Sequence, residues 1–238
     1  DSTIPGREGG TVTFEVGGDV RTAIAEFGRA RGATDFTILL AAWTAWLGRV
    51  AGTTDVVVGS PVQGRPSVRF DKTIGDFVNI LPLRVHLDAD QGFAALLDQV
   101  RTTVLQGMAH QDYPLPLMVP SGPGGEGPPF QTMFVLQDFT RFGELQQWML
   151  GGGGEPATFG RLELEPFRLH QQEGQFPLSL DAWVNGEGWA FSCTYDASLF
   201  DHATVERRME EFVTLLHGIA ADPERHVSAL PVMPESQL

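Results

Sequence analysis

A short, continuously apolar run, Asp55-Val-Val-Val-Gly59, constrains the fold of this chain more than any other feature of the sequence. It is bounded by turn-forming residues, which is typical of a strand that is covered on both faces. Helices are predicted before it over 34–50 and after it over 92–108, because apolar residues recur there at helical spacing. A buried strand between two helices predicts an α/β layer.

The rest of the chain extends this pattern. Further helices are predicted over 19–31 and 202–221, and further strands over 11–16, 77–87, 130–137, 162–169, 176–184 and 189–196. Asn185-Gly186 is a hairpin-turn signal between the last two strands. The run Gly151-Gly-Gly-Gly154 has little backbone preference, so 140–160 is predicted to be an irregular stretch that is mobile or bridges to another part of the protein. We expect residues 1–230 to form one unit and 231–238 to begin an interdomain linker.

Composition and charge exclude several functions. The net charge of −14 argues against nucleic acid as a partner, because phosphate-binding surfaces gather Lys and Arg. No stretch approaches the roughly 20 apolar residues that span a bilayer, so no membrane partner is expected. The single cysteine, Cys193, has no disulfide partner in the chain and fits a reducing compartment. We therefore predict a cytoplasmic protein in which Cys193 is a small buried apolar residue.

Common local signatures of catalysis are missing from the sequence. The glycine clusters lie in proline-rich segments rather than between a strand and a helix, so nucleotide binding is unsupported. None of the six histidines has a second His or Cys at a metal-ligand spacing. No serine lies in a Gly-x-Ser-x-Gly elbow.

Two segments near the apolar run are dense in polar and special residues. Gly59-Ser-Pro-Val-Gln-Gly-Arg65 places Ser60 and Arg65 directly after a buried strand, where side chains commonly reach into a cleft. A turn with a surface arginine would explain it equally well. The segment 74–84 embeds Asn79 in an apolar strand entry, where a buried amide must bond to backbone groups or serve a ligand.

A third segment, Ala109-His-Gln-Asp-Tyr-Pro114, follows a predicted helix. His110 could cap the last carbonyls of that helix, and Asp112 could open a turn. The same two residues, with Gln111 between them, could instead line a site. The sequence alone leaves both interpretations open.

Taken in order, these segments resemble condensation domains of nonribosomal peptide synthetases. The family pattern Gly-x-Pro-Val-x-Gly-Arg is matched by 59–65, Ile-Gly-x-Phe-Val-Asn-Thr-Leu-x-Leu-Arg by 74–84, and His-Gln-Asp-Tyr-Pro-Phe by 110–115. The chain departs from the family at Asp76, where an aromatic residue is usual, at Leu115, where Phe is usual, and over 121–129, where the family has Arg-Asp-x-Ser-Arg-x-Pro-Leu. It also lacks the motif His-His-x-x-x-Asp-Gly, because no two histidines are adjacent.

The resemblance implies a chloramphenicol acetyltransferase-like lobe, with a mixed sheet flanked by helices, that forms the C-terminal half of a two-lobed, V-shaped domain. Such a domain forms an amide bond between a donor thioester and an acceptor amine, both delivered on phosphopantetheine arms of carrier proteins. The lobe would form a tunnel wall, bind no cofactor directly and be inactive alone, because the missing motif supplies the histidine that positions or deprotonates the amine. Its tunnel-lining or lobe-interface residues would be Ser60, Arg65, Asn79, His110, Gln111 and Asp112.

The partners implied are an N-terminal lobe, donor and acceptor carrier proteins, and an adjacent adenylation domain. Two other hypotheses remain open. One is a noncatalytic, condensation-like recruitment module that binds a carrier protein or a partner enzyme. The other is a self-sufficient small acyltransferase in which His110 is the base.

Overall fold

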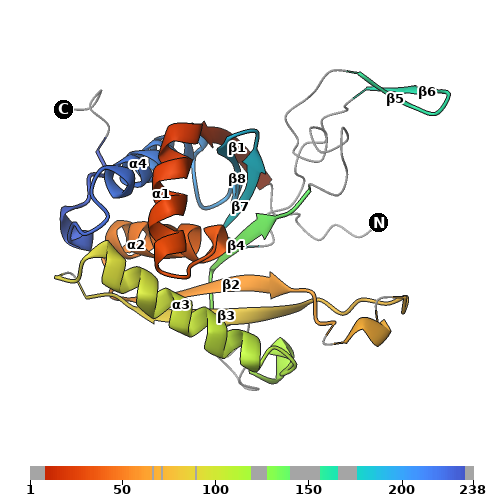
Figure 1. Cartoon of the computed structure of the whole chain (residues 1–238), viewed down its shortest axis with the longest axis horizontal. Helices are drawn as coiled ribbons and strands as arrows, with labels where there is room; N and C mark the ends of the chain where they lie inside the picture. Colours follow the sequence, from red (N-terminus) through yellow and green to blue (C-terminus); the bar gives the residue numbers. More distant parts are fainter. Residues whose placement is uncertain are drawn as a thin grey trace.

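The computed structural model describes residues 9–65, 67–70, 72–88, 90–118, 128–139, 156–165 and 176–233. Their centre is a six-stranded sheet in the order β1-β8-β7-β4-β2-β3 (Figure 1). The strands are β1 Gly9–Val16, β2 Asp55–Val62, β3 Asn79–His86, β4 Thr132–Gln137, β7 Leu178–Asn185 and β8 Gly188–Asp196. Neighbours β2, β4 and β7 run parallel, and the remaining pairs are antiparallel. The predicted mixed α/β layer is therefore confirmed.

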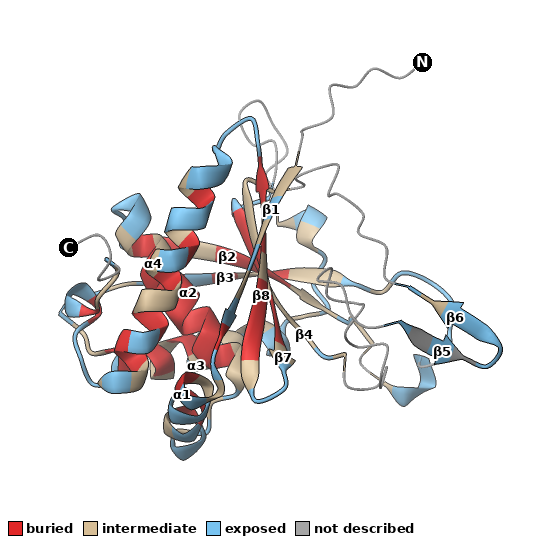
Figure 2. Ribbon diagram, turned by 90° about the horizontal axis from the view of Figure 1, so that it is seen from above, coloured by how far each residue is buried: buried red, intermediate tan, exposed pale blue. Residues whose placement is uncertain are grey.

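Four helices cover one face of this sheet (Figure 2). They are α1 Gly18–Ala30, α2 Asp35–Ala51, α3 Phe93–Ala109 and α4 His202–Ala221. Side chains alternate along each strand, so one set faces the helices: Phe134 meets Phe36 of α2 at 5.6 Å, and Phe191 meets Phe212 of α4 at 5.9 Å between ring centroids. The opposite face carries no helix among the described residues, and we call it the helix-free face.

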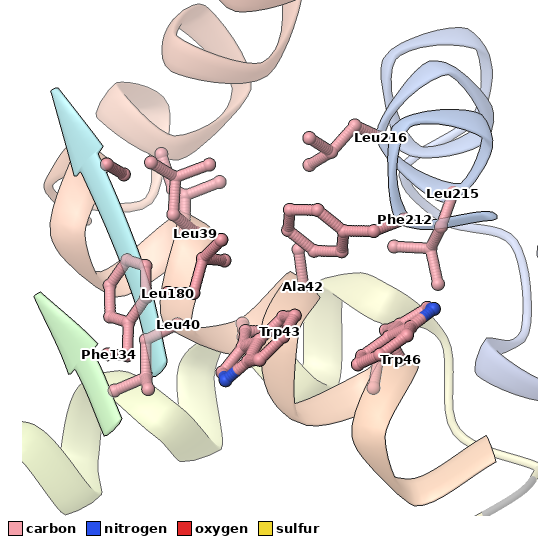
Figure 3. Close-up of a cluster of buried hydrophobic side chains, with 14 of the residues drawn as sticks. Leu39, Leu40, Ala42, Trp43, Trp46, Phe134, Leu180, Phe212, Leu215 and Leu216 are labelled. Carbon is pink, nitrogen blue, oxygen red and sulfur yellow. The ribbon is translucent and has the colours of Figure 1, made fainter. Parts of the chain in front are cut away.

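Helix α2 forms the centre of the hydrophobic core (Figure 3). Thr34 caps it, since its side-chain oxygen accepts the Thr37 N–H at 3.3 Å. Trp43 and Trp46 stack at 4.7 Å, and the ring of Phe212 lies edge-on to Trp43 at 5.4 Å. These rings are almost completely buried, as expected for a helix that is apolar on more than one side.

The structure corrects two predicted strand boundaries. Strand β2 continues to Val62 rather than ending at Gly59, because its pairing with β3 extends to Val62 opposite Asn79. The strand predicted over 162–169 is observed only as β6 Leu162–Leu164, and residues 166–175 lie outside the described residues. Strand β6 pairs in a small hairpin with β5 Ala157–Phe159, which lies in the segment predicted to be irregular. Residues 140–155, most of the segment predicted to be irregular, lie outside the described residues too.

Shorter elements complete the chain. Single 3₁₀ turns occupy Val68–Phe70, Leu115–Leu117 and Val227–Ala229. The predicted hairpin turn is confirmed, with Gly186 at a φ of 58°, where glycine is favoured. None of the helices in the described ranges is long and apolar enough to cross a membrane.

Candidate functional site

The three polar motifs of the sequence meet at one edge of the sheet. The first motif contains the carboxyl end of β2, the second contains the start of β3, and the third follows α3. Because β2, β4 and β7 are parallel, their carboxyl ends lie at this same edge, which is where α/β sheets usually bind ligands.

Asn79 joins the second motif to the third. Its Nδ2 donates to the carbonyl oxygens of Gln111 and Tyr113, each at 2.8 Å, and its Oδ1 accepts the Leu115 N–H at 3.2 Å. The amide therefore uses both ends to hold the loop after α3 against the start of β3. Gln111 takes part through its carbonyl, while the side chain of Asp112 is exposed.

Arg65 folds the loop between β2 and β3 back on itself. Its guanidinium donates to the carbonyl oxygens of Phe70, Thr73 and Gly75, and it lies 4.3 Å from the centroid of the Phe77 ring. Gly64, just before it, has a φ of 59°, and a Cβ there would lie 1.7 Å from the Phe77 carbonyl oxygen. The Gly-Arg pair of the first motif thus has a clear structural role.

Ser60 and His110 also have local partners. Ser60 is only 3% exposed and lies within β2, where its Oγ donates to the Phe134 carbonyl of neighbouring β4 at 2.9 Å. His110 is exposed, and its Nδ1 lies 2.9 Å from the Gln106 carbonyl. A carbonyl only accepts, so Nδ1 is the donor and His110 caps the end of α3. The capping interpretation of His110 agrees with the structure.

The two loops that Asn79 ties together expose large apolar side chains. Ile74 is fully exposed at 101%, Val68 is exposed at 82% and Leu117 at 67%. With Val78 and Tyr113, they form what we call the loop patch. Large apolar side chains exposed on two loops that are joined in this way make the loop patch a candidate for contact with another protein.

A cavity of about 620 Å³ lies away from these motifs, at the amino ends of β2, β4 and β7. Its lining is mainly apolar and comes from the end of α2, the starts of the three strands and the start of α4. Sequence reasoning missed it because no single segment supplies more than a few of its residues. The described residues contain no group of three His, Cys, Asp or Glu side chains placed to hold a metal ion.

Asp55, Cys193 and Asp181 are among the titratable groups whose pKa values are shifted. The Arg84 guanidinium donates to both carboxylate oxygens of Asp55, at 2.8 and 2.6 Å, and lowers the pKa of Asp55. Burial raises the pKa of the Cys193 thiol, in agreement with its predicted role in the core. Burial also raises the pKa of Asp181, in the middle of β7. Asp181 is a candidate that the sequence motifs did not include, although an acid within an apolar strand is a visible signal.

Known proteins resemble this chain along nearly its full length. The condensation domain family matches residues 5–237. Bacitracin synthase 3 of Bacillus licheniformis is 30% identical over 235 residues, which cover 97% of this chain and 4% of that protein. A linear gramicidin synthase of Brevibacillus parabrevis is 34% identical over 240 residues, which cover 98% of this chain and 4% of that protein.

Solved structures agree in fold. A four-domain nonribosomal peptide synthetase, holo-AB3403, superposes with a TM-score of 0.84 at 22% identity, over 96% of this chain and 18% of that one. The first condensation domain of the CDA synthetase superposes with a TM-score of 0.73 at 20% identity, over 98% of this chain and 50% of that one. The chain therefore spans half the length of that solved condensation domain and a few per cent of the curated relatives.

Proposed function

The chain belongs to the condensation domain family of nonribosomal peptide synthetases, and from that premise we propose that it is the C-terminal lobe of such a domain. The predicted chloramphenicol acetyltransferase-like fold is confirmed by its structural neighbours. One observation carries the proposal of a half-domain: 98% of this chain aligns with only 50% of a solved condensation domain. The absence of adjacent histidines agrees with it, because the resemblance assigns that motif to the other lobe.

The edge of the sheet at which the three polar motifs meet is called the motif edge. We further propose that this motif edge and the helix-free face of the sheet meet the second lobe and form one wall of a substrate tunnel. The exposed loop patch supports this, since Ile74 and Val68 would otherwise leave apolar surface in water. Asn79, Arg65 and His110 would shape the loops of this wall, while Gln111 and Asp112 would present polar groups on it. Ser60 would act from inside β2 by fixing its position against β4.

The proposed reaction joins an acceptor amine to the acyl group of a donor thioester. The amine nitrogen forms a bond to the carbonyl carbon, the carbon–sulfur bond breaks, and the amine proton passes to the leaving thiolate. Catalysis would rest on orienting the two reactants and on moving that proton, with the histidine of the other lobe assisting. This lobe would supply binding surface.

The partners proposed are the N-terminal lobe, donor and acceptor carrier proteins that carry their substrates on phosphopantetheine arms, and an adjacent adenylation domain. Residues 231–238 would begin the linker toward that domain. A cytoplasmic location belongs to the same proposal and is supported by the single, buried thiol of Cys193.

Reconstitution from two purified halves tests the proposal. This chain is mixed with a separately expressed N-terminal lobe that carries His-His-x-x-x-Asp-Gly, and then with loaded donor and acceptor carrier proteins. Amide product is expected from the mixture, none from either half, and none after the second histidine of that motif is changed to Ala. A mixture that binds a carrier protein or a partner enzyme but forms no amide would support a recruitment module instead.

His110→Ala tests the remaining hypothesis, a self-sufficient small acyltransferase in which His110 is the base. The half-domain proposal expects no turnover from the chain alone, with or without this substitution. Turnover by the chain alone that is lost in His110→Ala would identify a self-sufficient acyltransferase and overturn the proposal.

A further inference from the structure

The helix-free face of the sheet carries a polar row at its centre. Asp181 of β7 lies opposite Ser192 of β8, and Ser192 lies opposite Thr13 of β1. The neighbouring strand residues Leu180 and Ala182 are fully buried and face the helices, so alternation turns Asp181 to the other face. A carboxylate therefore lies near the middle of the helix-free face.

Asp181 has a neutral partner and no cation. Gln137, at the carboxyl end of β4, donates from Nε2 to Asp181 Oδ1 at 3.2 Å. Among the described residues, no Arg, Lys or His side chain pairs with this carboxylate. Burial of the group raises its pKa, which means that the fold holds the ionised form at a cost. Groups held in this way without a charged partner are often binding sites.

A buried hydrogen-bond donor that finds no acceptor among the described residues lies on the same face. Trp183 follows Asp181 by two residues and pairs in register with Gln137, so all three side chains lie on this face. Trp183 is only 6% exposed, and its indole Nε1 has no hydrogen-bond acceptor within the described part of the chain. A buried hydrogen-bond donor without an acceptor is rare in high-resolution protein structures. Within the described ranges, the helix-free face thus holds a carboxylate, Asp181, that has no cationic partner and, beside it, an indole N–H, Trp183, that has no acceptor.

We propose that Asp181, held in place by Gln137, binds the protonated amine of the acceptor aminoacyl group. This inference rests on the proposed function, because it assigns the helix-free face to the substrate tunnel. A primary ammonium group supplies the missing positive charge and can donate to the Asp181 oxygen that Gln137 leaves free. Asp181 would then hold the acceptor on this wall, and donors without a free amine would not need it.

Ligand titration of this chain tests the inference directly. The probe is alanyl-aminopantetheine, in which an amide replaces the labile thioester, and its N-acetyl derivative serves as a probe without charge. Binding is followed by NMR through the indole N–H resonance of Trp183, assigned by its loss in Trp183→Phe. Asp181→Asn keeps the size of the side chain and the oxygen that accepts from Gln137. Asp90→Asn, at an exposed residue in the loop before α3, is the matched control.

Wild type and Asp90→Asn should bind the free amine equally, and Asp181→Asn should weaken binding by at least about tenfold. Acetylation should weaken binding to wild type by a similar factor, and it should change binding to Asp181→Asn little. Equal binding of the free and acetylated probes to wild type overturns the inference without reliance on any variant.

Kinetics of the reconstituted domain separate this inference from the proposed function. Asp181→Asn should raise the KM for the acceptor carrier protein by about tenfold and leave the KM for the donor unchanged. An active wild-type domain whose acceptor KM is unchanged in Asp181→Asn refutes the role of Asp181 and leaves the proposed function intact. A wild-type mixture that makes no amide refutes the proposed function, while the titration still decides whether Asp181 binds an amine.

Discussion

Replacing Asn79 by Ala should loosen the motif edge and destabilise the whole chain. The substitution removes three hydrogen bonds, two to the carbonyls of Gln111 and Tyr113 and one from the Leu115 N–H. Each is worth about 0.5 to 1.5 kcal/mol net, and water can reach part of this loop, so the free energy of unfolding should fall by about 2 to 3 kcal/mol. For a chain of this length, the melting temperature should fall by roughly 5 to 10 °C.

Urea unfolding gives the free energy, and hydrogen exchange at the Leu115 amide shows whether the loss is local. Exchange at Leu115 should accelerate, whereas amides in the middle of α2 should change only with global stability. Asn185→Ala is the matched control, because exposed Asn185 donates a single bond to Glu15 at 2.9 Å and should cost less than about 1 kcal/mol. If Asn79→Ala unfolds within about 0.5 kcal/mol of wild type, the bonds of Asn79 do not organise this edge.

Three further outcomes are expected. Gly64→Ala should lower the free energy of unfolding in urea by more than about 2 kcal/mol. Gly52→Ala, at a φ of 62° with open space around it, should lower it by only about 1 kcal/mol. Equal losses would show that the Phe77 carbonyl can move aside. Asp181→Asn should stabilise the chain at pH 7, because the pKa of Asp181 is higher in the folded chain than in the unfolded chain. Wild type therefore loses stability as the pH rises from about 4 through the folded pKa, whereas the variant does not. The advantage of the variant should vanish below about pH 4. A gain that is the same at every pH would exclude ionisation as its cause. Cys193 should react with iodoacetamide about a hundredfold more slowly in the folded chain than in urea, and rapid labelling of the folded chain would contradict its burial.

The candidate residues illustrate a limit of sequence reasoning. Asn79 stood out because a polar residue is unusual at the start of an apolar strand, and Arg65 and His110 stood out because they follow a buried strand and a helix. The sequence could not say whether they serve a ligand or the chain itself. The structure gives Arg65 and Asn79 backbone partners in their own or a neighbouring loop, and it gives His110 a backbone partner in the last turn of α3. Asp181 was overlooked because its hydrogen-bond partner, Gln137 of β4, is 44 residues away in the sequence.

The sequence by itself determined the type of nearly every element and the family to which the chain belongs. Period and turn chemistry are local properties, so helix α2, the buried strand β2 and the hairpin at Gly186 could be predicted from neighbouring residues alone. Only the tertiary structure decided the order of the strands and the placement of all four helices on one face. That placement puts Asp181 on the helix-free face. Such features depend on contacts between segments far apart in the chain, and the local pattern of polar and apolar residues does not encode which segments will pair.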